Sequence, residues 1–385
     1  MKNKIILSLI FVGVVAFSYG LFVGHYEIFP YSFLSEIKNS SSQNQSDERL
    51  QIYQEISPTK NLISFNNISD IDNTKQMLNQ YIWNNPELPD DLVTKHKYDV
   101  QDSIISKLKN LERIDSFTIE MNHGMNSIAY LFLAENTDNK LIIYHQGHNA
   151  ISLNDFDNHS FDQDIPLIQN FLDNNYSVLI FSMPGKGMNN EPIINHEKFG
   201  TLKINSHNHF EFLETKNFHP LRFFIEPIVL TLNQIEKDYS FEKFSMIGLS
   251  GGGWTTIVIS AIDDRISESY SVAGSFPIWL RSDSRDFGDY EQTIPEFYQI
   301  ANYEELYFLG AYGDNRSLFL FYNEFDSCCF SGQLYEKFPF GDSIKNKLAE
   351  FGKYNFDIII DHDQTEHIIS DYTLGKITTQ IKNNS

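Results

Sequence analysis

Short apolar runs alternate with segments of helical periodicity from residue 115 to the end of the chain. Runs of about four to eight residues rich in β-branched and aromatic side chains are typical of strands, and strands that alternate with helices are typical of a sheet covered on both faces. The pattern predicts eight strands, at residues 116–121, 127–134, 141–144, 178–182, 244–247, 269–272, 318–322 and 356–360. It predicts helices at residues 163–174, 222–237, 252–262, 332–351 and 368–377.

The lengths of the connections indicate how these strands pair. Only a few residues around His123 separate the first two predicted strands, which suits an antiparallel hairpin, whereas helix-length segments separate the later strands, as parallel pairing requires. Two connections, residues 188–221 and 276–315, are longer than a crossover needs, and long insertions often cover a pocket. We therefore expect a mostly parallel α/β sheet that opens antiparallel and carries two cap insertions.

An uncharged apolar segment, residues 5–24, lies near the N-terminus. About twenty helical residues span the roughly 30 Å hydrocarbon core of a bilayer. Lys2 and Lys4 precede the segment, and the positive-inside rule places that side in the cytoplasm. We predict a single transmembrane anchor at residues 1–25, with the rest of the chain extracytoplasmic. A cleaved signal peptide, which would leave a secreted or periplasmic protein, stays open as an alternative.

Residues 26–114 separate this segment from the strand-rich region. Residues 36–48 have almost no apolar side chains and are typical of a solvated linker. Helical periodicity near residues 74–83 and 99–111 predicts an N-terminal helical segment that packs against the strand-rich region. We therefore expect one large domain, residues 115–385, behind an anchor and a linker.

Composition narrows the class of protein. The 385 residues include 29 Lys+Arg and 51 Asp+Glu, a formal net charge of −22, which disfavours a nucleic-acid partner because clustered Lys and Arg hold phosphates. Apolar residues make up 41% and aromatic residues 14%, enough for a large packed core. The only two cysteines, Cys328 and Cys329, are adjacent, so no disulfide framework stabilises the fold, and their redox state is left open.

A Gly-x-Ser-x-Gly motif runs from Gly248 to Gly252, between a predicted strand and a predicted helix, with Ser250 at its centre. A nucleophilic serine in this motif occupies a tight, strained turn, so its hydroxyl projects above the sheet edge and the flanking positions lack a Cβ. The helix after the turn directs its N-terminal N–H groups at developing negative charge. The motif therefore predicts a nucleophilic serine, with a glycine-rich phosphate-binding turn as the alternative.

With this motif, and with an acid and a histidine following the serine in that order, the chain resembles the α/β-hydrolases over about residues 115–385. The resemblance implies an α/β-hydrolase fold and a catalytic triad. It places the acid in the loop after the seventh predicted strand, where Asp326 is preferred to Glu324. It places the general base in the loop after the last predicted strand, where His367 is preferred to His362.

The loop at residues 145–149, His-Gln-Gly-His-Asn, resembles the His-Gly loop of the same family. The resemblance implies an oxyanion hole in which the backbone N–H groups of His148 and Gly251 bind the developing charge, with Gly147 permitting the turn. Gln146 separates the first histidine from the glycine, which is a departure from the commonest dipeptide.

Some histidines also have spacings that suit metal ligands. His145 and His148 are three residues apart, and a His-x-His pair, His207 and His209, lies in the first insertion. Each pair would need further ligands from elsewhere in the chain, and we expect no metal and no organic cofactor. Charged residues of the second insertion could line a polar substrate pocket, and these are Arg281, Arg285, Asp286, Asp289 and Glu291.

Together these residues predict a serine hydrolase that cleaves a carboxylic ester through an acyl-enzyme. Ser250 would attack the carbonyl, and His367, oriented by Asp326, would act as the general base. A small-molecule or carbohydrate ester would suit an exported, membrane-tethered domain. Two alternatives stay open: a serine peptidase that resembles the prolyl oligopeptidases, and a non-catalytic surface protein that binds through the same scaffold. The sequence leaves the acyl group and the oligomeric state open.

Overall fold

The computed structural model describes Tyr19 and residues 62–383, apart from residues 103, 105–106, 138, 151–163 and 282–283. The predicted anchor, residues 1–25, and the linker after it lie outside the described residues, with the exception of Tyr19. No described helix combines the length and the apolar character needed to cross a bilayer. From Leu62 onward the described residues belong to one compact unit.

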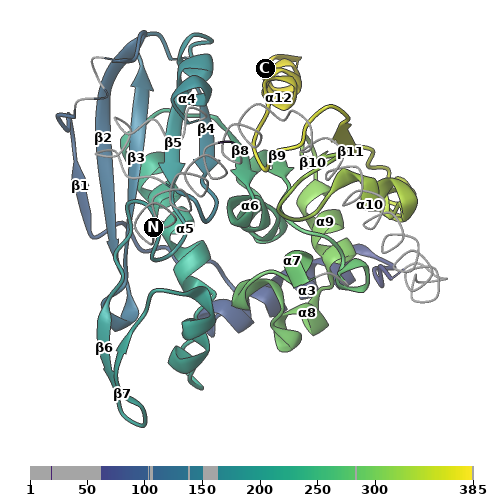
Figure 1. Cartoon of the computed structure of the whole chain (residues 1–385), viewed down its shortest axis with the longest axis horizontal. Coiled ribbons are helices and arrows are strands. Elements are labelled where there is room, and N and C mark those ends of the chain that lie inside the picture. Colours follow the sequence, from purple (N-terminus) through teal and green to yellow (C-terminus); the bar gives the residue numbers. More distant parts are fainter. Residues whose placement is uncertain are drawn as a thin grey trace, which may run out of the picture. The chain divides into compact units, whose positions relative to one another are not determined.

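A nine-stranded sheet lies at the centre of this unit, in the order β1-β2-β3-β5-β4-β8-β9-β10-β11 (Figure 1). The strands are β1 (Lys95–Lys97), β2 (Leu111–Glu120), β3 (Asn126–Ala134), β4 (Lys140–His145), β5 (Ser177–Phe181), β8 (Lys243–Leu249), β9 (Ile266–Val272), β10 (Ser317–Asn323) and β11 (Phe356–Asp361). Pairings from β1 to β5 along this order are antiparallel, and every pairing from β5 to β11 is parallel. The eight predicted strands and the predicted change of direction are therefore confirmed.

Helices cover both faces of the sheet (Figure 1). They are α4 (Asp164–Leu172), α5 (Arg222–Asp238), α6 (Gly251–Ile262), α9 (Tyr303–Ala311), α11 (Gly341–Glu350) and α12 (Asp371–Asn383). Ile142 and Tyr144 of β4 belong to a hydrophobic core that also contains side chains of α4 and α12. Leu141 and Ile143 alternate with them and are equally buried, so they point to the opposite face, where α6 contacts the sheet.

The N-terminal segment is only partly as predicted. A helix, α3 (Ile68–Trp83), is present and contacts both α6 and α8 (Pro295–Ile300). The second predicted helix, at residues 99–111, is wrong, because the described residues there contain no α-helix. Asp99 and Asn110, at the two ends of this stretch, have φ values of 54° and 59°, a left-handed conformation outside a right-handed helix. The strand β1 before this stretch makes the sheet nine-stranded instead of eight-stranded, and three polar residues carry no strand signal.

Two predicted helices near the C-terminus have different ends. The helix predicted at residues 332–351 is divided into α10 (Gly332–Lys337) and α11 around Pro339, which has no N–H to continue a helix. Helix α12 begins at Asp371, later than expected, because the loop after β11 extends to Ser370. The hydroxyl of Ser370 donates a hydrogen bond to the carboxylate of Asp361 and holds this loop against the end of β11.

The two long insertions contact each other. The first contains the hairpin β6 (Ile193–His196) and β7 (Gly200–Lys203) and the 3-10 helix η4 (His207–Leu213), and the second contains η5 (Ile278–Leu280), α7 (Ser284–Phe287), η6 (Tyr290–Gln292) and α8. The backbone N–H of Tyr290 donates a 3.0 Å hydrogen bond to the side chain of Asn208. Helix α9 lies within residues 276–315, the stretch predicted to form the second cap, but it is buried at every residue and packs on α6, so it belongs to the layer that covers the sheet.

Candidate active site

Ser250 occupies a sharp turn between β8 and α6. Its backbone has φ 57° and ψ −123°, a conformation that a residue with a Cβ rarely adopts and that costs about 1–3 kcal/mol. The backbone N–H of Ser250 donates a 2.9 Å hydrogen bond to the carbonyl of Val272, the last residue of β9. The end of the neighbouring strand therefore holds the strained turn in place and leaves the side chain half-buried.

The glycines of the motif have no room for a side chain. A Cβ on Gly248 would overlap the carbonyl oxygen of Gly252, and a Cβ on Gly252 would overlap the carbonyl oxygen of His145. Helix α6 can begin this close to β4 and β8 only with glycine at both positions. The spacing of the motif is thus required by packing as well as by the backbone of the serine.

Asp326 and His367 form a hydrogen-bonded pair. Nδ1 of His367 lies 2.8 Å from Oδ2 of Asp326, and the exposed fractions of the two side chains are 15% and 0%. Oδ1 of Asp326 accepts hydrogen bonds from the backbone N–H groups of Cys328, at 2.8 Å, and Cys329, at 3.2 Å. Because an ionised carboxylate only accepts, Nδ1 carries the proton and Nε2 presents a lone pair.

The other two candidates form a separate pair at the surface. Nδ1 of His362 lies 2.8 Å from Oε2 of Glu324, and the His362 side chain is 65% exposed. Neither residue lines the pocket that contains Ser250. The structure therefore joins each acid to one histidine, and only the pair of Asp326 and His367 faces the serine.

Opposing effects act on the pKa of His367. Burial lowers the pKa, whereas the hydrogen bond to Asp326 and the negative charge of Asp326 raise it. Burial is the largest single effect, but the raising effects together exceed it, so the pKa lies above the ordinary value of 6.5. The protonated imidazole, which forms when a general base takes a proton, is therefore stabilised.

A pocket of about 380 Å³ brings the serine and the histidine together. Its lining includes Ser250, His367, His148, Cys328 and Cys329. No hydrogen bond joins the hydroxyl of Ser250 to His367 within the part of the chain that the structure describes. Catalytic hydrogen bonds are often long in free enzymes and shorten when the substrate binds, so this geometry is compatible with catalysis.

The loop after β4 lies directly against the serine. A Cβ on Gly147 would lie 2.8 Å from Cβ of Ser250, and a Cβ on Gly251 would lie 2.7 Å from Cε1 of His148. Gly147 thus allows the loop to approach the serine, and the ring of His148 packs on the residue after it. Among the described residues, the backbone N–H groups of His148 and Gly251 have no hydrogen-bond partner. Both N–H groups therefore stay available as donors close to Ser250.

Gln146, which separates His145 from Gly147, holds this loop in place through hydrogen bonds of its side chain. Its Oε1 accepts a 2.6 Å hydrogen bond from the hydroxyl of Ser182, and its Nε2 donates a 2.8 Å hydrogen bond to Asp164. The hydroxyl of Tyr144 donates to the other oxygen of Asp164 at 2.7 Å. All four side chains are buried, so this network fixes the loop to β4, β5 and α4.

Solved structures of other proteins share this architecture. The acetyl xylan esterase from Paenibacillus sp. R4 is 13% identical to this chain, with a TM-score of 0.52 over 87% of this chain and 99% of the esterase. Acetyl xylan esterase 1 from Thermoanaerobacterium sp. JW/SL YS485 is 14% identical, with a TM-score of 0.50 over 86% of this chain and 96% of the esterase. The methylesterase BT1017 is 12% identical, with a TM-score of 0.55 over 82% of this chain and 62% of the methylesterase.

The chain has the α/β-hydrolase fold. At 12–14% identity the likeness concerns the fold alone. No family model and no curated protein sequence matches the chain. The roles of individual residues in this hydrolase fold therefore rest on their geometry.

Asn323, at the end of β10, is a site residue that the sequence did not indicate. Its side-chain nitrogen donates hydrogen bonds to the backbone carbonyls of Glu366, at 2.9 Å, and Ile368, at 3.0 Å. Beside it, the acid loop and the histidine loop pair through their backbones, with N–H groups of residues 325 and 327 donating to the carbonyls of residues 364 and 365 at 3.0 and 3.1 Å. An asparagine at a strand end has no distinctive motif, so its role is visible only in the fold.

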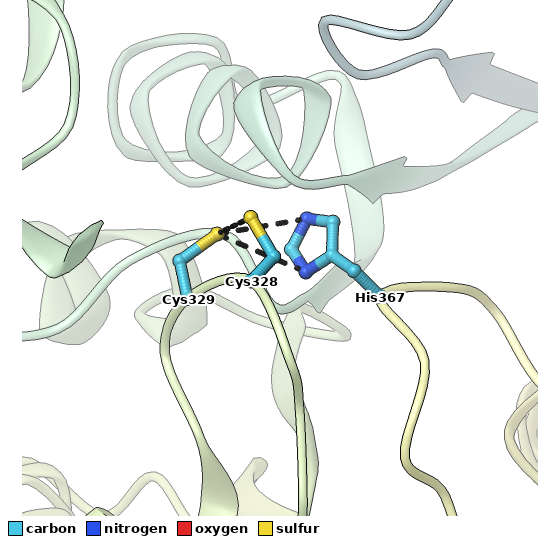
Figure 2. A group of neighbouring side chains, drawn as sticks. All are labelled: Cys328, Cys329 and His367. Atoms are coloured by element: carbon cyan, nitrogen blue, oxygen red, sulfur yellow. Dashed lines mark hydrogen bonds between the residues drawn. The ribbon is translucent and has the colours of Figure 1, made fainter. Parts of the chain in front are cut away.

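Cys328 and Cys329 lie beside His367, and the thiol of Cys329 is directed at its ring (Figure 2). Both cysteines are free, with the two Sγ atoms 2.6 Å apart, and Sγ of Cys329 lies 3.9 Å from each ring nitrogen of His367. The hydrogen bond between the thiols lowers the pKa of Cys328 to about 6, and the same bond raises the pKa of Cys329. The cysteines thus contribute their backbone N–H groups to Asp326 and their side chains to the pocket wall.

The structure does not pair the histidines as their spacing suggested. His145 is buried, with Nδ1 2.8 Å from the carbonyl oxygen of Gln146, and burial lowers its pKa to about 4. His209 lies beside the carbonyl of Lys203. Instead, His148 from the first pair lies beside His207 from the second, with Nε2 of His148 3.1 Å from Nδ1 of His207.

The charged residues of the second insertion have separate positions. Arg281 is buried, donates to the side chain of Gln292 at 2.9 Å and stacks over the ring of Tyr303, so it is a core residue and does not line the pocket. Arg285 and Asp289 line the pocket. The expectation of a polar pocket wall therefore holds for part of this set.

Proposed function

We propose that this chain is a serine hydrolase that cleaves carboxylic esters. The observation that carries the proposal is the arrangement of a strained serine and a buried acid–histidine pair around one pocket. Ser250 is the nucleophile, His367 the general base and Asp326 the acid that orients the imidazole. The backbone N–H groups of His148 and Gly251 form the oxyanion hole, with Gly147 allowing the close approach.

The reaction proceeds through an acyl-enzyme. Oγ of Ser250 attacks the ester carbonyl while Nε2 of His367 takes the hydroxyl proton, and the oxyanion accepts hydrogen bonds from the two backbone N–H groups. The bond to the alcohol then breaks, and His367 gives its proton to the leaving oxygen. Water, deprotonated by His367, attacks the acyl carbon, and the acid leaves as Ser250 regains its proton.

An ester on a carbohydrate is the substrate class that we propose. The pocket of about 380 Å³ is large enough for a short acyl group with part of a sugar, and Arg285 and Asp289 on its wall suit hydroxyl groups. The names of two proteins with this fold, acetyl xylan esterases, support the same class. The alcohol side of the substrate would contact the two insertions.

Labelling with a fluorophosphonate probe tests the proposed nucleophile. The purified full chain is expected to become labelled, Ser250→Ala to lose the label, and Ser240→Ala, at an exposed serine, to keep it. Turnover of Ser250→Ala is expected to fall by about 10⁴–10⁶-fold. Labelling that persists in Ser250→Ala, or an unlabelled native chain, would support the non-catalytic surface protein instead.

A substrate panel separates the esterase from the peptidase. Acetylated sugars and p-nitrophenyl acetate are expected to be cleaved faster than longer acyl esters, and dipeptide anilides with proline are expected to resist cleavage. Preference for the anilides would favour the alternative of a prolyl-oligopeptidase-like enzyme.

Tethering to a membrane is the remaining part of the proposal. The uncharged run at residues 5–24 supports it. The full chain is expected to stay in the membrane fraction after alkaline extraction, and replacement of Val14 and Val15 by Asp to release it. Mass spectrometry of the N-terminus would reveal a cleaved signal peptide, which would exclude the anchor.

A further inference from the structure

Four side chains of metal-binding types converge beside the pocket, from three segments of the chain. His148 comes from the loop after β4, His207 from η4, and Asp289 and Glu291 from the start of η6. One ligand atom of each lies within 4.8 Å of the ligand atoms of the other three. We propose that these side chains bind one divalent transition-metal ion, and Zn²⁺ is the best match to two imidazoles and two carboxylates.

The distances between the ligand atoms fit a tetrahedral ion. Nε2 of His148 lies 3.1 Å from Nδ1 of His207, 3.0 Å from Oδ2 of Asp289 and 3.7 Å from Oε1 of Glu291. Nδ1 of His207 lies 3.2 Å from Oε2 of Glu291 and 3.8 Å from Oδ2 of Asp289. Ligand atoms about 2.0–2.1 Å from a tetrahedral zinc ion are about 3.3–3.4 Å from one another, in the middle of this range.

One ring nitrogen of His207 bonds to the backbone, which leaves the other directed at the cluster. Nε2 of His207 lies 3.0 Å from the carbonyl oxygen of Pro184, which only accepts, so Nε2 carries a proton. Nδ1 of His207 is therefore the ring nitrogen that is directed at Glu291 and at Nε2 of His148. A cation at the centre attracts all four ligand atoms at once.

The bond from His207 to Pro184 is also what a metal-binding histidine requires. Such a histidine donates its other ring N–H to a carbonyl or a carboxylate, which fixes the tautomer and the orientation of the ring. The ring of His207 is further held between Phe210, with 5.3 Å between ring centroids, and Phe224, with 5.0 Å. Its Nδ1 atom is thus preorganised toward the centre of the cluster.

The charge and the burial of the four side chains also favour a divalent cation. The side chains of His207 and Glu291 are 1% and 0% exposed, and burying a carboxylate without a positive partner is costly. Among the described residues, neither Asp289 nor Glu291 forms an ion pair with a lysine or arginine. Two neutral imidazoles with two carboxylates have a net charge of −2, which a divalent ion neutralises.

The ion would connect the two insertions with the loop after β4. The ring of His148 packs on Gly251, where a Cβ would lie 2.7 Å from its Cε1 atom. A metal bound to His148 would therefore hold in place the loop that lies against Ser250. Its role is to position this loop, whose backbone N–H at His148 belongs to the proposed oxyanion hole.

Metal titration of the purified full chain tests this site. After treatment with a chelator, calorimetry with Zn²⁺ is expected to give one site per chain, and Zn²⁺ is expected to raise the Tm. Co²⁺ in place of Zn²⁺ is expected to give the strong visible absorption of tetrahedral cobalt. These measurements do not use ester hydrolysis, so the metal site and the proposed function can fail independently.

Matched variants locate the ion. Asp289→Asn and Glu291→Gln are expected to weaken Zn²⁺ binding by about 100-fold or more. His209→Ala and Glu211→Gln, on the same helix η4 as His207 but outside the cluster, are expected to leave the affinity unchanged. The Asp289 side chain is 40% exposed, so its variant is expected to fold. Absence of a one-to-one site, an octahedral cobalt spectrum, or equal losses in the two control variants would each overturn the proposal.

Discussion

The side-chain amide of Asn323 donates a 2.9 Å hydrogen bond to the backbone carbonyl of Glu366, the residue before His367. A second hydrogen bond, 3.0 Å long, goes to the carbonyl of Ile368 on the other side. Without the amide, Asn323→Ala is expected to lower kcat by up to about 100-fold, because a displacement of about 1 Å at a catalytic group has an effect of that size. Steady-state kinetics on an ester checks this, and KM is expected to change little.

Asn217→Ala is the matched control for this variant, because Asn217 is exposed and its side chain forms no hydrogen bond among the described residues. Its kcat is expected to equal that of the native chain. A native kcat in Asn323→Ala would contradict a role for Asn323 in positioning the histidine loop.

The raised pKa of His367 predicts the pH dependence of hydrolysis. Only the neutral imidazole can take the serine proton, so kcat/KM is expected to fall as the pH drops through this pKa, with a midpoint above 6.5. In Asp326→Asn the hydrogen-bonded charge that raises the pKa is lost while burial still lowers it, so the midpoint is expected to move down. Turnover of this variant is expected to fall by about 10⁴-fold. A pH–rate profile measures both effects.

Glu324→Gln is the control for the pH profile. Its histidine partner, His362, lies outside the pocket, so the midpoint and the turnover are expected to stay close to native. A profile that shifts in Glu324→Gln and not in Asp326→Asn would assign the catalytic pair to the surface residues instead.

Gly147 separates the loop after β4 from the serine. In Gly147→Ala the new Cβ would lie 2.8 Å from Cβ of Ser250 and 2.9 Å from the carbonyl oxygen of Leu249. The loop has to move away, which is expected to lower the free energy of unfolding by about 1–3 kcal/mol and to reduce kcat. Denaturant unfolding and ester kinetics measure the two effects.

Gly375 is a glycine with room for a side chain, in contrast to Gly147. It lies within α12 and a Cβ there meets no atom within 4 Å, so Gly375→Ala is expected to raise the free energy of unfolding by about 0.5–1 kcal/mol without a change in kcat. Equal stability changes in the two alanine variants would show that crowding at Gly147 is not the cause.

The thiol of Cys328 is expected to react readily with iodoacetamide at neutral pH, because its hydrogen bond with Cys329 lowers its pKa to about 6. The added group would fill part of the pocket and slow hydrolysis. The double variant Cys328→Ser, Cys329→Ser is expected to keep kcat within about tenfold, because backbone N–H groups hold Asp326. A loss as large as that of Ser250→Ala would mean that a thiol takes part in the chemistry.

Local signals account for what the sequence predicted well. Apolar runs of strand length gave all eight main strands, and the glycines around Ser250 indicated the turn because each of them fills a position without room for a Cβ. Strand β1 has three residues, Lys95–Lys97, and no apolar alternation, so it carried no signal. The predicted helix at residues 99–111 rested on a periodic pattern alone, and the described residues there form no α-helix.

Contacts between distant segments account for what the sequence could not predict. Asn323 lies 43 residues before Glu366, and its bond depends on the pairing of β10 with β11. Spacing pairs His148 and His207 each with a histidine of its own loop, whereas the fold joins the two across 59 residues. Spacing within a loop indicates only local partners, and side chains that meet through tertiary structure have no such pattern.

Strands β10 and β11 are adjacent and in register up to the pair Asn323 and Asp361, and the backbones of their loops stay hydrogen-bonded beyond that point. The acid and the histidine are therefore carried by one small unit built on two neighbouring strand ends, and the second insertion contacts it where the backbone N–H of Phe330 donates to the carboxylate of Asp286. The distance between the acid and the base is thus set mainly by the pairing of β10 with β11 and of the loops that follow them. The paired ends of β10 and β11, with the two loops that follow them, are therefore a compact module for engineering an acid–histidine pair into another parallel sheet.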